Sequence, residues 1–391
     1  MVQVSVPRPL NLPDFPWDSL RPYRKKAAEH PDGVCDLSVG TPVDETPLCV
    51  REALAQASQA PGYPTVIGTD EVREAILRWC RRRSMIDVGH TGVIPTIGSK
   101  EAVAWLPFIL GVRPGDVVLV PECAYPTYDV GARLAGAVAI PVDPYAIDTW
   151  PDAQLVWLNS PGNPDGHVLS VQQLCAVREW AARRGAIVIS DECYASLPWE
   201  EPYASQGVPS LLDERVCEGD PTGLLVVYSL SKQSNLAGYR AGLLAGDPAL
   251  VSLVVQLRKH SGMMVPTPVQ HAMAVALDDV QHVDEQRERY RVRRECLLAA
   301  LQGTDLVCDP LSVAGLYLWV RQAQQGEDAA TVFSRGGGDS WALVDRFARA
   351  GIVVAPGDFY GEAARGAVRV ALTASDDRIR AAALRISAMT R

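Results

Sequence analysis

Short apolar runs alternate with segments of helical periodicity through the middle of the chain. Four runs have the length and composition of buried strands, and they span residues 116–121, 154–158, 186–190 and 224–228. Between the second and third runs, apolar residues recur at helical spacing from Ser170, a suitable N-cap, to Gly185, where the helix should end. Strands separated by helices predict an α/β fold with a mostly parallel sheet covered by helices. Ligand sites in such sheets form at the carboxyl ends of the strands.

The last third of the chain has a different pattern. Residues from about Pro268 to Leu301 predict one long charged helix whose charges form a solvated face. Beyond it, apolar runs at 316–320 and 368–372 predict strands of a smaller α+β unit. The segment Gly336–Asp339 between these strands is expected to form a mobile surface loop without a phosphate role, because it lacks the G-x-G-x-x-G context.

Size and composition favour a soluble enzyme of two domains. The chain has 391 residues, of which 48% are apolar and 21% charged, and its net charge is −9. This charge and the lack of a sustained basic cluster argue against nucleic-acid binding, since the densest cationic run, Arg81–Arg83, is expected only to end a helix. No apolar run has the length of a membrane span, and residues 1–16 lack the apolar region of a signal peptide.

The cysteines and histidines give no metal motif. Nine cysteines are scattered without C-x-x-C spacing, and the six histidines form no H-E-x-x-H pattern. We therefore expect a reduced, cytoplasmic protein without a metal site.

One segment carries the clearest chemistry. Residues 229–240, Ser-Leu-Ser-Lys-Gln-Ser-Asn-Leu-Ala-Gly-Tyr-Arg, directly follow the predicted strand 224–228. The hydroxyls of Ser229 and Ser231 and the guanidinium of Arg240 are suited to bind a phosphate. Lys232, held near positive charge and partly desolvated, would lose its proton more easily and could form a Schiff base with an aldehyde. The alternative from the residues alone is a surface lysine in a serine-rich turn.

Further polar and aromatic residues follow other predicted strands. Asp191 ends the run 186–190, and its carboxylate is either a helix N-cap or a partner for the pyridine nitrogen of pyridoxal phosphate (PLP). Tyr194 follows and could donate to the ring hydroxylate of the same cofactor. Asn163 lies in a Pro- and Gly-rich turn after the run 154–158, where it is either a turn residue or a second partner for the ring oxygen.

Three more positions complete the candidate set. Ser99 and Lys100 open an apolar helical pattern, so their backbone N–H groups could bind a phosphate. Tyr125 follows the run 116–121 and is either a core tyrosine or a ring that stacks on the cofactor. Arg369 lies inside an apolar strand, and a buried guanidinium needs an anionic partner, which is either a structural carboxylate or that of a substrate.

Together and in this order, these motifs resemble the aspartate-aminotransferase-like class of PLP enzymes, fold type I. The resemblance runs from Ser38-Val39-Gly40-Thr41-Pro42 to Arg369. Residues 229–242, 258–266 and 354–361 are similar to actinobacterial succinyldiaminopimelate aminotransferases. The resemblance implies a large PLP-binding domain at residues 46–280 and a small domain at 281–391, with residues 1–45 as an N-terminal arm and part of the small domain.

The resemblance also implies residue roles. Lys232 would form the Schiff base with PLP and move the proton between substrate and cofactor, while Asp191 pairs with the pyridine nitrogen. Arg369, helped by the backbone near Gly40, would bind the substrate α-carboxylate. Tyr63 would reach the phosphate of the partner subunit's cofactor, which requires a homodimer. The remaining cofactor contacts implied are Asn163 and Tyr194 at the ring oxygen, Tyr125 on the ring, and Ser99, Lys100, Ser229, Ser231 and Arg240 at the phosphate.

Transamination between an amino acid and 2-oxoglutarate is the expected reaction, with N-succinyl-diaminopimelate as the donor that the resemblance suggests. The anionic distal end of that donor could meet Lys100, Lys259 or His260. Elimination, replacement or carbon–carbon bond formation on the same scaffold is the alternative, and an inactive or regulatory homologue is a third. One departure from the family pattern bears on this choice: the turn carries Asp165, either as a local cap or as the mark of a changed substrate, and His167 follows it.

Overall fold

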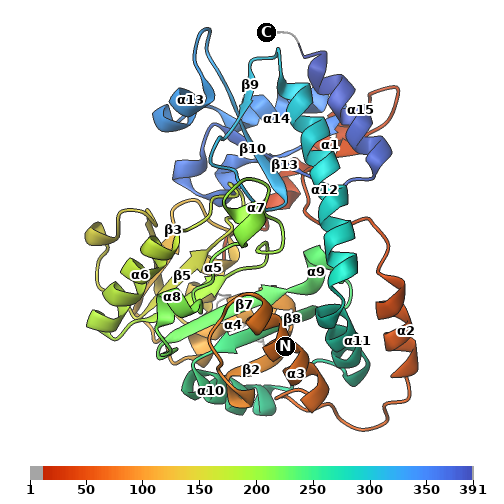
Figure 1. The fold of residues 1–391 in the computed structure, drawn as a ribbon. Helices are drawn as coiled ribbons and strands as arrows, with labels where there is room; N and C mark the ends of the chain where they lie inside the picture. The colour runs from red at the N-terminus through yellow and green to blue at the C-terminus, as the bar shows by residue number, and fades with distance from the viewer. Residues whose placement is uncertain (1–11, 390–391) are drawn as a thin grey trace, which may run out of the picture.

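The computed structural model describes residues 12–389, and a seven-stranded sheet forms its centre (Figure 1). The strand order is β2-β8-β7-β6-β5-β3-β4. Neighbouring strands from β7 to β4 run parallel, while β8 runs antiparallel to both β7 and β2. The bounds are β2 Val93–Ile97, β3 Val117–Pro121, β4 Val138–Val142, β5 Leu155–Asn159, β6 Ile187–Asp191, β7 Leu224–Ser229 and β8 Ala241–Gly246.

Helices cover both faces of this sheet, as the alternating apolar runs require. Along β7, Leu225 and Val227 pack with one set of helices, while Leu224 and Val226 pack with the other. The first set comprises α4 Gly98–Ile109, α5 Thr127–Leu134 and α10 Pro248–Ser261. The second comprises α3 Asp70–Arg82, α6 Val171–Arg184, α8 Glu214–Cys217 and α11 Thr267–Asp278. The predicted α/β fold is confirmed.

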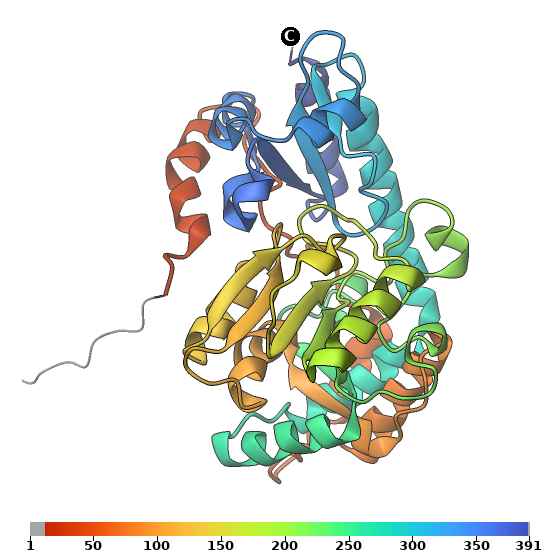
Figure 2. The ribbon, with the colours of Figure 1, turned by 90° about the vertical axis from the view of Figure 1, so that its left-hand side faces the viewer.

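A second, smaller unit combines the two ends of the described chain. Its four-stranded antiparallel sheet has the order β12-β13-β10-β9, and β1 pairs in parallel with β11. Figure 2 shows the N-terminal helix beside the C-terminal elements. The strands are β1 Cys35–Asp36, β9 Leu306–Cys308, β10 Tyr317–Gln322, β11 Ile352–Val353, β12 Ala355–Pro356 and β13 Ala367–Ala371, and the helices are α1 Arg21–Ala27, α13 Ala329–Arg335, α14 Ser340–Arg349 and α15 Asp376–Ser387.

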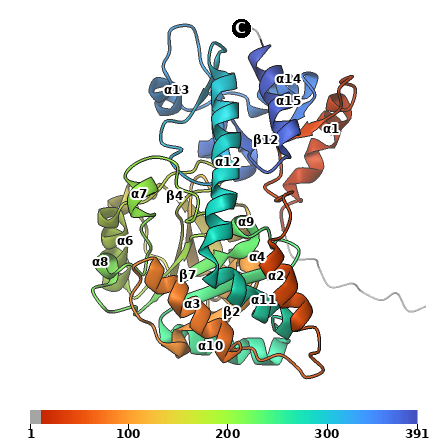
Figure 3. The ribbon, with the colours of Figure 1, turned by 45° about the vertical axis from the view of Figure 1, so that its right-hand side comes forward.

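The remaining elements connect the two units or lie in loops. The long helix α12, Val280–Leu301, runs from the large sheet to the small one (Figure 3). The others are α2 Leu48–Gln56, α7 Tyr203–Gln206, α9 Leu230–Gln233 and the 3₁₀ turns η1 Pro16–Leu20, η2 His90–Gly92, η3 Ile147–Thr149, η4 Gly357–Tyr360 and η5 Glu362–Ala364. Within residues 12–389, no helix is both long enough and apolar enough to cross a membrane.

Local sequence signals explain several element boundaries. Ser170 forms a capping box with Gln173 at the start of α6, and Gly185 ends that helix in the left-handed conformation. The run Arg81–Arg83 ends α3, as predicted. The six predicted strands are present within two residues of the expected bounds.

One helix prediction is wrong. The segment 268–301 is not a single helix, because α11 ends at Asp278 and α12 begins at Val280. Asp279 between them is extended, and its carboxylate accepts the backbone N–H groups of Gln281 and His282. Asp278 and Asp279 are adjacent acidic residues at the break, and the sequence pattern did not reveal that Asp279 acts as an N-cap.

Candidate active site

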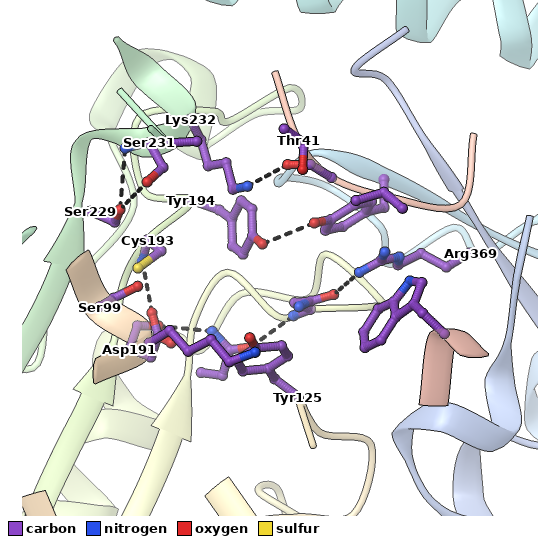
Figure 4. Close-up of a pocket in the computed structure, with 18 of the residues that line it drawn as sticks. Thr41, Ser99, Tyr125, Asp191, Cys193, Tyr194, Ser229, Ser231, Lys232 and Arg369 are labelled. Carbon is purple, nitrogen blue, oxygen red and sulfur yellow. Dashed lines mark hydrogen bonds between the residues drawn. The ribbon is translucent and has the colours of Figure 1, made fainter. Parts of the chain in front are cut away.

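A cavity of about 510 Å³ lies at the carboxyl ends of the parallel strands, against the small unit. The structure brings twelve of the thirteen predicted site residues to its walls: Gly40, Ser99, Lys100, Tyr125, Asn163, Asp191, Tyr194, Ser229, Ser231, Lys232, Arg240 and Arg369. Tyr63 does not line it; this side chain lies between α2 and α3 and is 97% exposed. Figure 4 shows the labelled residues converging from both units.

Lys232 reaches into the centre of the cavity. It lies on the short helix α9, directly after β7, and its Nζ donates a hydrogen bond to the carbonyl oxygen of Gly40. Burial lowers the pKa of Lys232, and the guanidinium groups of Arg369 and Arg240 lower it further against the opposing influence of Tyr317. A lysine in this setting can supply the neutral amine that condensation with an aldehyde needs.

Asp191 is buried at the end of β6. Its Oδ2 accepts a hydrogen bond from Tyr128 Oη at 3.0 Å, and its Oδ1 accepts one from the backbone N–H of Cys193 at 3.2 Å. Burial raises the pKa of Asp191, although both hydrogen bonds favour the carboxylate. A cationic ring nitrogen would restore the balance toward the charged form, so this carboxylate fits a pyridinium.

The predicted phosphate site is a tight cradle at the start of α4. A Cβ on Gly98, whose φ is +69°, would lie 2.6 Å from Nη2 of Arg240, and one on Gly242 would lie 2.8 Å from the Gly98 carbonyl carbon. The hydroxyl oxygens of Ser229 and Ser231 are 2.9 Å apart. No carboxylate pairs with Arg240 in the described part of the chain. The Nη1 of Arg240 donates to the Ala237 carbonyl oxygen at 2.9 Å, so within residues 12–389 its positive charge has only a neutral partner. The backbone N–H groups that open α4, the two hydroxyls and this guanidinium fit a phosphate group.

Arg369 is buried on β13 without a carboxylate partner in residues 12–389. Its Nη1 donates to Asn163 Oδ1 at 2.9 Å and its Nη2 to the Ser38 carbonyl oxygen at 2.7 Å. Its Nε is buried and has no hydrogen-bond partner among the described residues. The Tyr317 ring centroid lies 3.9 Å from the guanidinium carbon. The positive charge of Arg369 is thus buried among neutral groups. An anionic ligand in the cavity would supply the partner that it lacks.

Tyr317 is an important residue that the sequence analysis missed. Its hydroxyl hydrogen-bonds with that of Tyr194 at 3.1 Å, and a Cβ on Gly40 would lie only 2.0 Å from its Oη. Burial opposes ionisation, but the charges of Arg369 and Lys232 lower the pKa of Tyr317. The only sequence signal for Tyr317 was its position in the predicted strand 316–320, where its side chain lies on the same face as that of Trp319. Other cavity residues that were missed include Trp17, Arg24, Thr41, Tyr128, Asn159 and Cys193.

The cavity mouth combines aromatic rings with charges. The rings of Phe15 and Trp17 lie 5.5 Å apart, and the Nζ of Lys100 lies 5.6 Å from the Phe15 ring. Arg24 and Asp18 also line this cavity. Of the three candidates for a distal anionic group, Lys100 lines the cavity, whereas Lys259 and His260 are exposed at the end of α10 and do not line it.

The unusual turn residues face away from this cavity. Asp165 Oδ1 accepts the backbone N–H of His167 at 3.2 Å, which is the cap geometry. Both residues line a separate cavity of about 720 Å³. His167 Nε2 lies 2.9 Å from Asp309 Oδ2 in the small unit. Although burial opposes the imidazolium, Asp165 and Asp309 raise the pKa of His167 to about 9.

Comparisons with known proteins agree with this geometry. The pattern of the aminotransferase class I and II family matches residues 32–386. The 4-dedimethylamino-4-oxo-anhydrotetracycline transaminase OxyQ of Streptomyces rimosus is 50% identical, over 96% of this chain and 99% of its own. A probable aminotransferase of Mycobacterium tuberculosis is 49% identical, over 96% and 86%.

Solved structures share the fold. A probable N-succinyldiaminopimelate aminotransferase from Thermus thermophilus superposes with a TM-score of 0.82 at 27% identity, over 95% of this chain and 99% of that one. The substrate-bound structure of BacF from Bacillus subtilis has a TM-score of 0.83 at 24% identity, over 98% of both chains, and supports the fold alone. The chain therefore belongs to the class I and II aminotransferases and is a PLP-dependent transaminase of fold type I.

Proposed function

We propose that the residues of the 510 Å³ cavity divide between cofactor and substrate as the motif order suggests. PLP supplies an aldehyde that bonds to amines and a ring that withdraws electrons from the attached carbon. Lys232 would hold the cofactor through Nζ and move the proton at the substrate Cα. Asp191 would hold the ring nitrogen protonated, and the cradle of Ser229, Ser231 and Arg240 would bind the phosphate.

The remaining cofactor contacts follow from the same placement. Tyr194 and Asn163 would donate to the ring oxygen, and Tyr125 would pack against the ring face. Ser99 and Lys100 would add backbone N–H groups to the phosphate site at the start of α4. All of these residues line one cavity with Lys232, which supports the assignment.

The substrate would be an α-amino acid whose carboxylate pairs with Arg369. The observation that carries this proposal is the buried guanidinium, which has no carboxylate partner in residues 12–389 and an unsatisfied Nε. The Nζ of Lys232 donates to the carbonyl oxygen of Gly40 in the same cavity, so a substrate held by Arg369 would bind beside Lys232. A carboxylate there would complete the hydrogen bonding of Arg369.

For the reacting pair, we favour N-succinyl-diaminopimelate as donor and 2-oxoglutarate as acceptor. Both carry a distal carboxylate, and Lys100 and Arg24 line the mouth through which a distal group would extend. The Thermus thermophilus structure named for the same donor superposes over almost the whole chain. Lys259 and His260 play no part in this proposal, because neither lines the cavity of its own chain.

A second candidate is amination of a polycyclic ketone. Phe15 and Trp17 at the mouth would offer flat apolar surfaces to fused rings. The relative named for a tetracycline ketone is 50% identical over 99% of its own length. In this alternative an amino acid still loads the enzyme through Arg369, and the ketone is the acceptor.

We also propose that the enzyme works as a cytoplasmic homodimer. Tyr63 is 97% exposed in a single chain, so it is free to reach another active site, and Tyr63 of the partner subunit would contact the cofactor phosphate. The cysteines in the described chain are all free thiols, in keeping with a reducing compartment.

The test is a pair of half-reactions with the full-length, PLP-loaded protein. L-Glutamate alone should bleach the yellow absorbance and release 2-oxoglutarate. The bleached enzyme is then offered the keto form of N-succinyl-diaminopimelate or a polycyclic aromatic ketone, and the acceptor that restores the colour identifies the substrate class. A yellow enzyme that glutamate fails to bleach would instead favour elimination, replacement or carbon–carbon bond formation.

An Arg369→Lys variant tests the carboxylate site. We expect KM for glutamate to rise by about 100-fold, because a bidentate charged contact worth about 2–3 kcal/mol is lost. Arg349→Lys is the matched control, since Arg349 is exposed on α14 and pairs only with Asp345 at 2.8 Å in the described chain. Equal KM values for the two variants would refute the role of Arg369.

A further inference from the structure

A smaller cavity of about 410 Å³ lies outside the active site, where the start of α2 meets the break between α11 and α12. Figure 3 shows α2, α11 and the lower end of α12 together on one side of the molecule. Cys49, Asp279 and His282 line this cavity. None of the three lines the active-site cavity, so the transaminase reaction leaves them unexplained.

The three side chains hold their donor atoms at the spacing of metal ligands. Cys49 Sγ lies 3.1 Å and His282 Nδ1 lies 3.3 Å from Asp279 Oδ2. All three donor atoms lie within 4.8 Å of one another. Tetrahedral zinc, with bonds of about 2.0–2.3 Å, places its ligand atoms about 3.3–3.8 Å apart. The observed spacing therefore needs only small shifts to surround a metal ion.

The environment of the His282 side chain is a second sign of a ligand. Its side chain is 8% exposed, and within residues 12–389 its buried Nδ1 makes no hydrogen bond of good geometry; the Asp279 carboxylate, 3.3 Å away, belongs to the same cluster. Its Nε2 lies 2.8 Å from Ser234 Oγ, a contact that can hold the proton on Nε2 and leave the lone pair of Nδ1 directed into the cavity. A hydrogen bond to the ring nitrogen that does not bind the metal is how proteins orient metal-binding histidines.

Hydrogen bonds also orient the carboxylate of Asp279. Its Oδ1 accepts the backbone N–H groups of Gln281 and His282 as the N-cap of α12, which leaves Oδ2 facing Cys49 and His282. The capping that ends the preceding helix thus also fixes the carboxylate of the cluster.

We propose that Cys49, Asp279 and His282 bind Zn²⁺, with water in the fourth position. A thiolate, an imidazole and a carboxylate are a ligand set typical of zinc. The Cys49 proton would leave to solvent on binding, so two anionic ligands and one neutral ligand would meet the dication. Four other charged residues line the cavity: Glu45, Arg51, Glu285 and Arg289. Glu45 and Arg51 form an ion pair with each other at 3.6 Å.

The bound ion would have a structural role. It would tie the start of α2 to the start of α12, and through Ser234 it would reach the segment that carries Lys232 two residues earlier. This inference does not depend on which substrate the enzyme uses.

The experiment uses full-length, PLP-loaded protein treated with chelator and desalted. After incubation with ZnCl₂ and a second desalting, we expect about one bound zinc per chain and a higher Tm. Cys49→Ser and His282→Gln should each weaken zinc binding by at least about 100-fold, because a ligand is removed. Cys175→Ser is the matched control, because Cys175 is a half-buried thiol on α6 that donates to the Arg215 carbonyl oxygen and does not line this cavity.

Co²⁺ gives a second readout. Its visible d–d bands, at wavelengths beyond the cofactor absorption, should show tetrahedral geometry in the wild type and in Cys175→Ser, but not in Cys49→Ser. Far-UV circular dichroism and retained PLP colour verify that each variant is folded. If Cys49→Ser does not fold, His282→Gln takes its place in the comparison. Wild-type protein that retains no zinc, or variants that retain as much as the wild type, would overturn the proposal.

Discussion

The Nε2 atom of His167 lies 2.9 Å from Oδ2 of Asp309, and this contact joins the two units of the molecule. His167 ends the turn that carries Asn163, whose side chain accepts from Arg369. Asp309 directly follows β9 of the small sheet. The contact therefore connects the expected substrate-binding turn to the unit that supplies Arg369.

His167→Gln should destabilise the protein by about 1–3 kcal/mol at neutral pH, because it removes a largely buried charged contact. Asp165 and Asp309 are the acidic groups that raise the pKa of His167 to about 9, and the Tyr145 ring lies 6.5 Å away. Because the pKa of His167 is higher in the folded state, its positive charge stabilises the fold fully below the unfolded value of about 6.5. This stabilisation is lost as the pH rises through about 9.

The difference in Tm between the wild type and His167→Gln should therefore shrink as the pH is raised from about 7 to about 10, a range that includes the raised pKa of His167. His271→Gln is the control, because His271 pairs with Glu71 at 2.8 Å on the outer surface. A difference that stays constant over this range would show that the imidazolium charge does not contribute.

Lys232→Ala should abolish transamination, with kcat reduced by at least about 1,000-fold, because both the cofactor attachment and the proton transfer depend on Nζ. The purified variant should also lack the yellow colour of the wild type. Lys25→Ala, at an exposed lysine of α1, is the control. Retention of wild-type activity by Lys232→Ala would reject the site assignment and revive a non-catalytic role for the chain.

Asp191→Asn should lower kcat by about 100-fold to 10,000-fold and weaken PLP binding, since the neutral amide cannot hold a ring nitrogen protonated. Tyr128→Phe removes only the 3.0 Å hydrogen bond to the same carboxylate. It should cost about 1 kcal/mol, or less than tenfold in kcat. Steady-state kinetics and PLP titration of both variants measure the difference, and equal effects would mean that Asp191 is only a structural cap.

Gly40→Ala should impair the enzyme because the new methyl group would lie 2.0 Å from Tyr317 Oη. Something must shift, and Lys232 hydrogen-bonds the carbonyl of this same residue. Tyr317→Phe removes the clashing oxygen, so the double variant should be more active than the product of the two single effects predicts. A double-mutant cycle on kcat/KM measures this coupling, and strict additivity would contradict the contact.

Local signals in the sequence determined much of this protein. Ser170 and Gly185 bound α6 because caps act within one helical turn. Lys232, Asp191 and Asn163 could be chosen because each follows an apolar strand, and parallel strands end at the same edge of a sheet. The α/β fold and the cofactor class followed from the order of such signals.

The tertiary structure decided the relationships between distant residues. The break at Asp279 depends on which acidic residue caps a helix, and the sequence pattern does not distinguish Asp279 from Asp278 beside it. The fit of Gly40 against Tyr317 and the contact of His167 with Asp309 join residues far apart in the chain. Cys49 and His282 form no sequence motif, so no metal site was expected. Local periodicity specifies elements, but only packing fixes which side chains of separate elements meet.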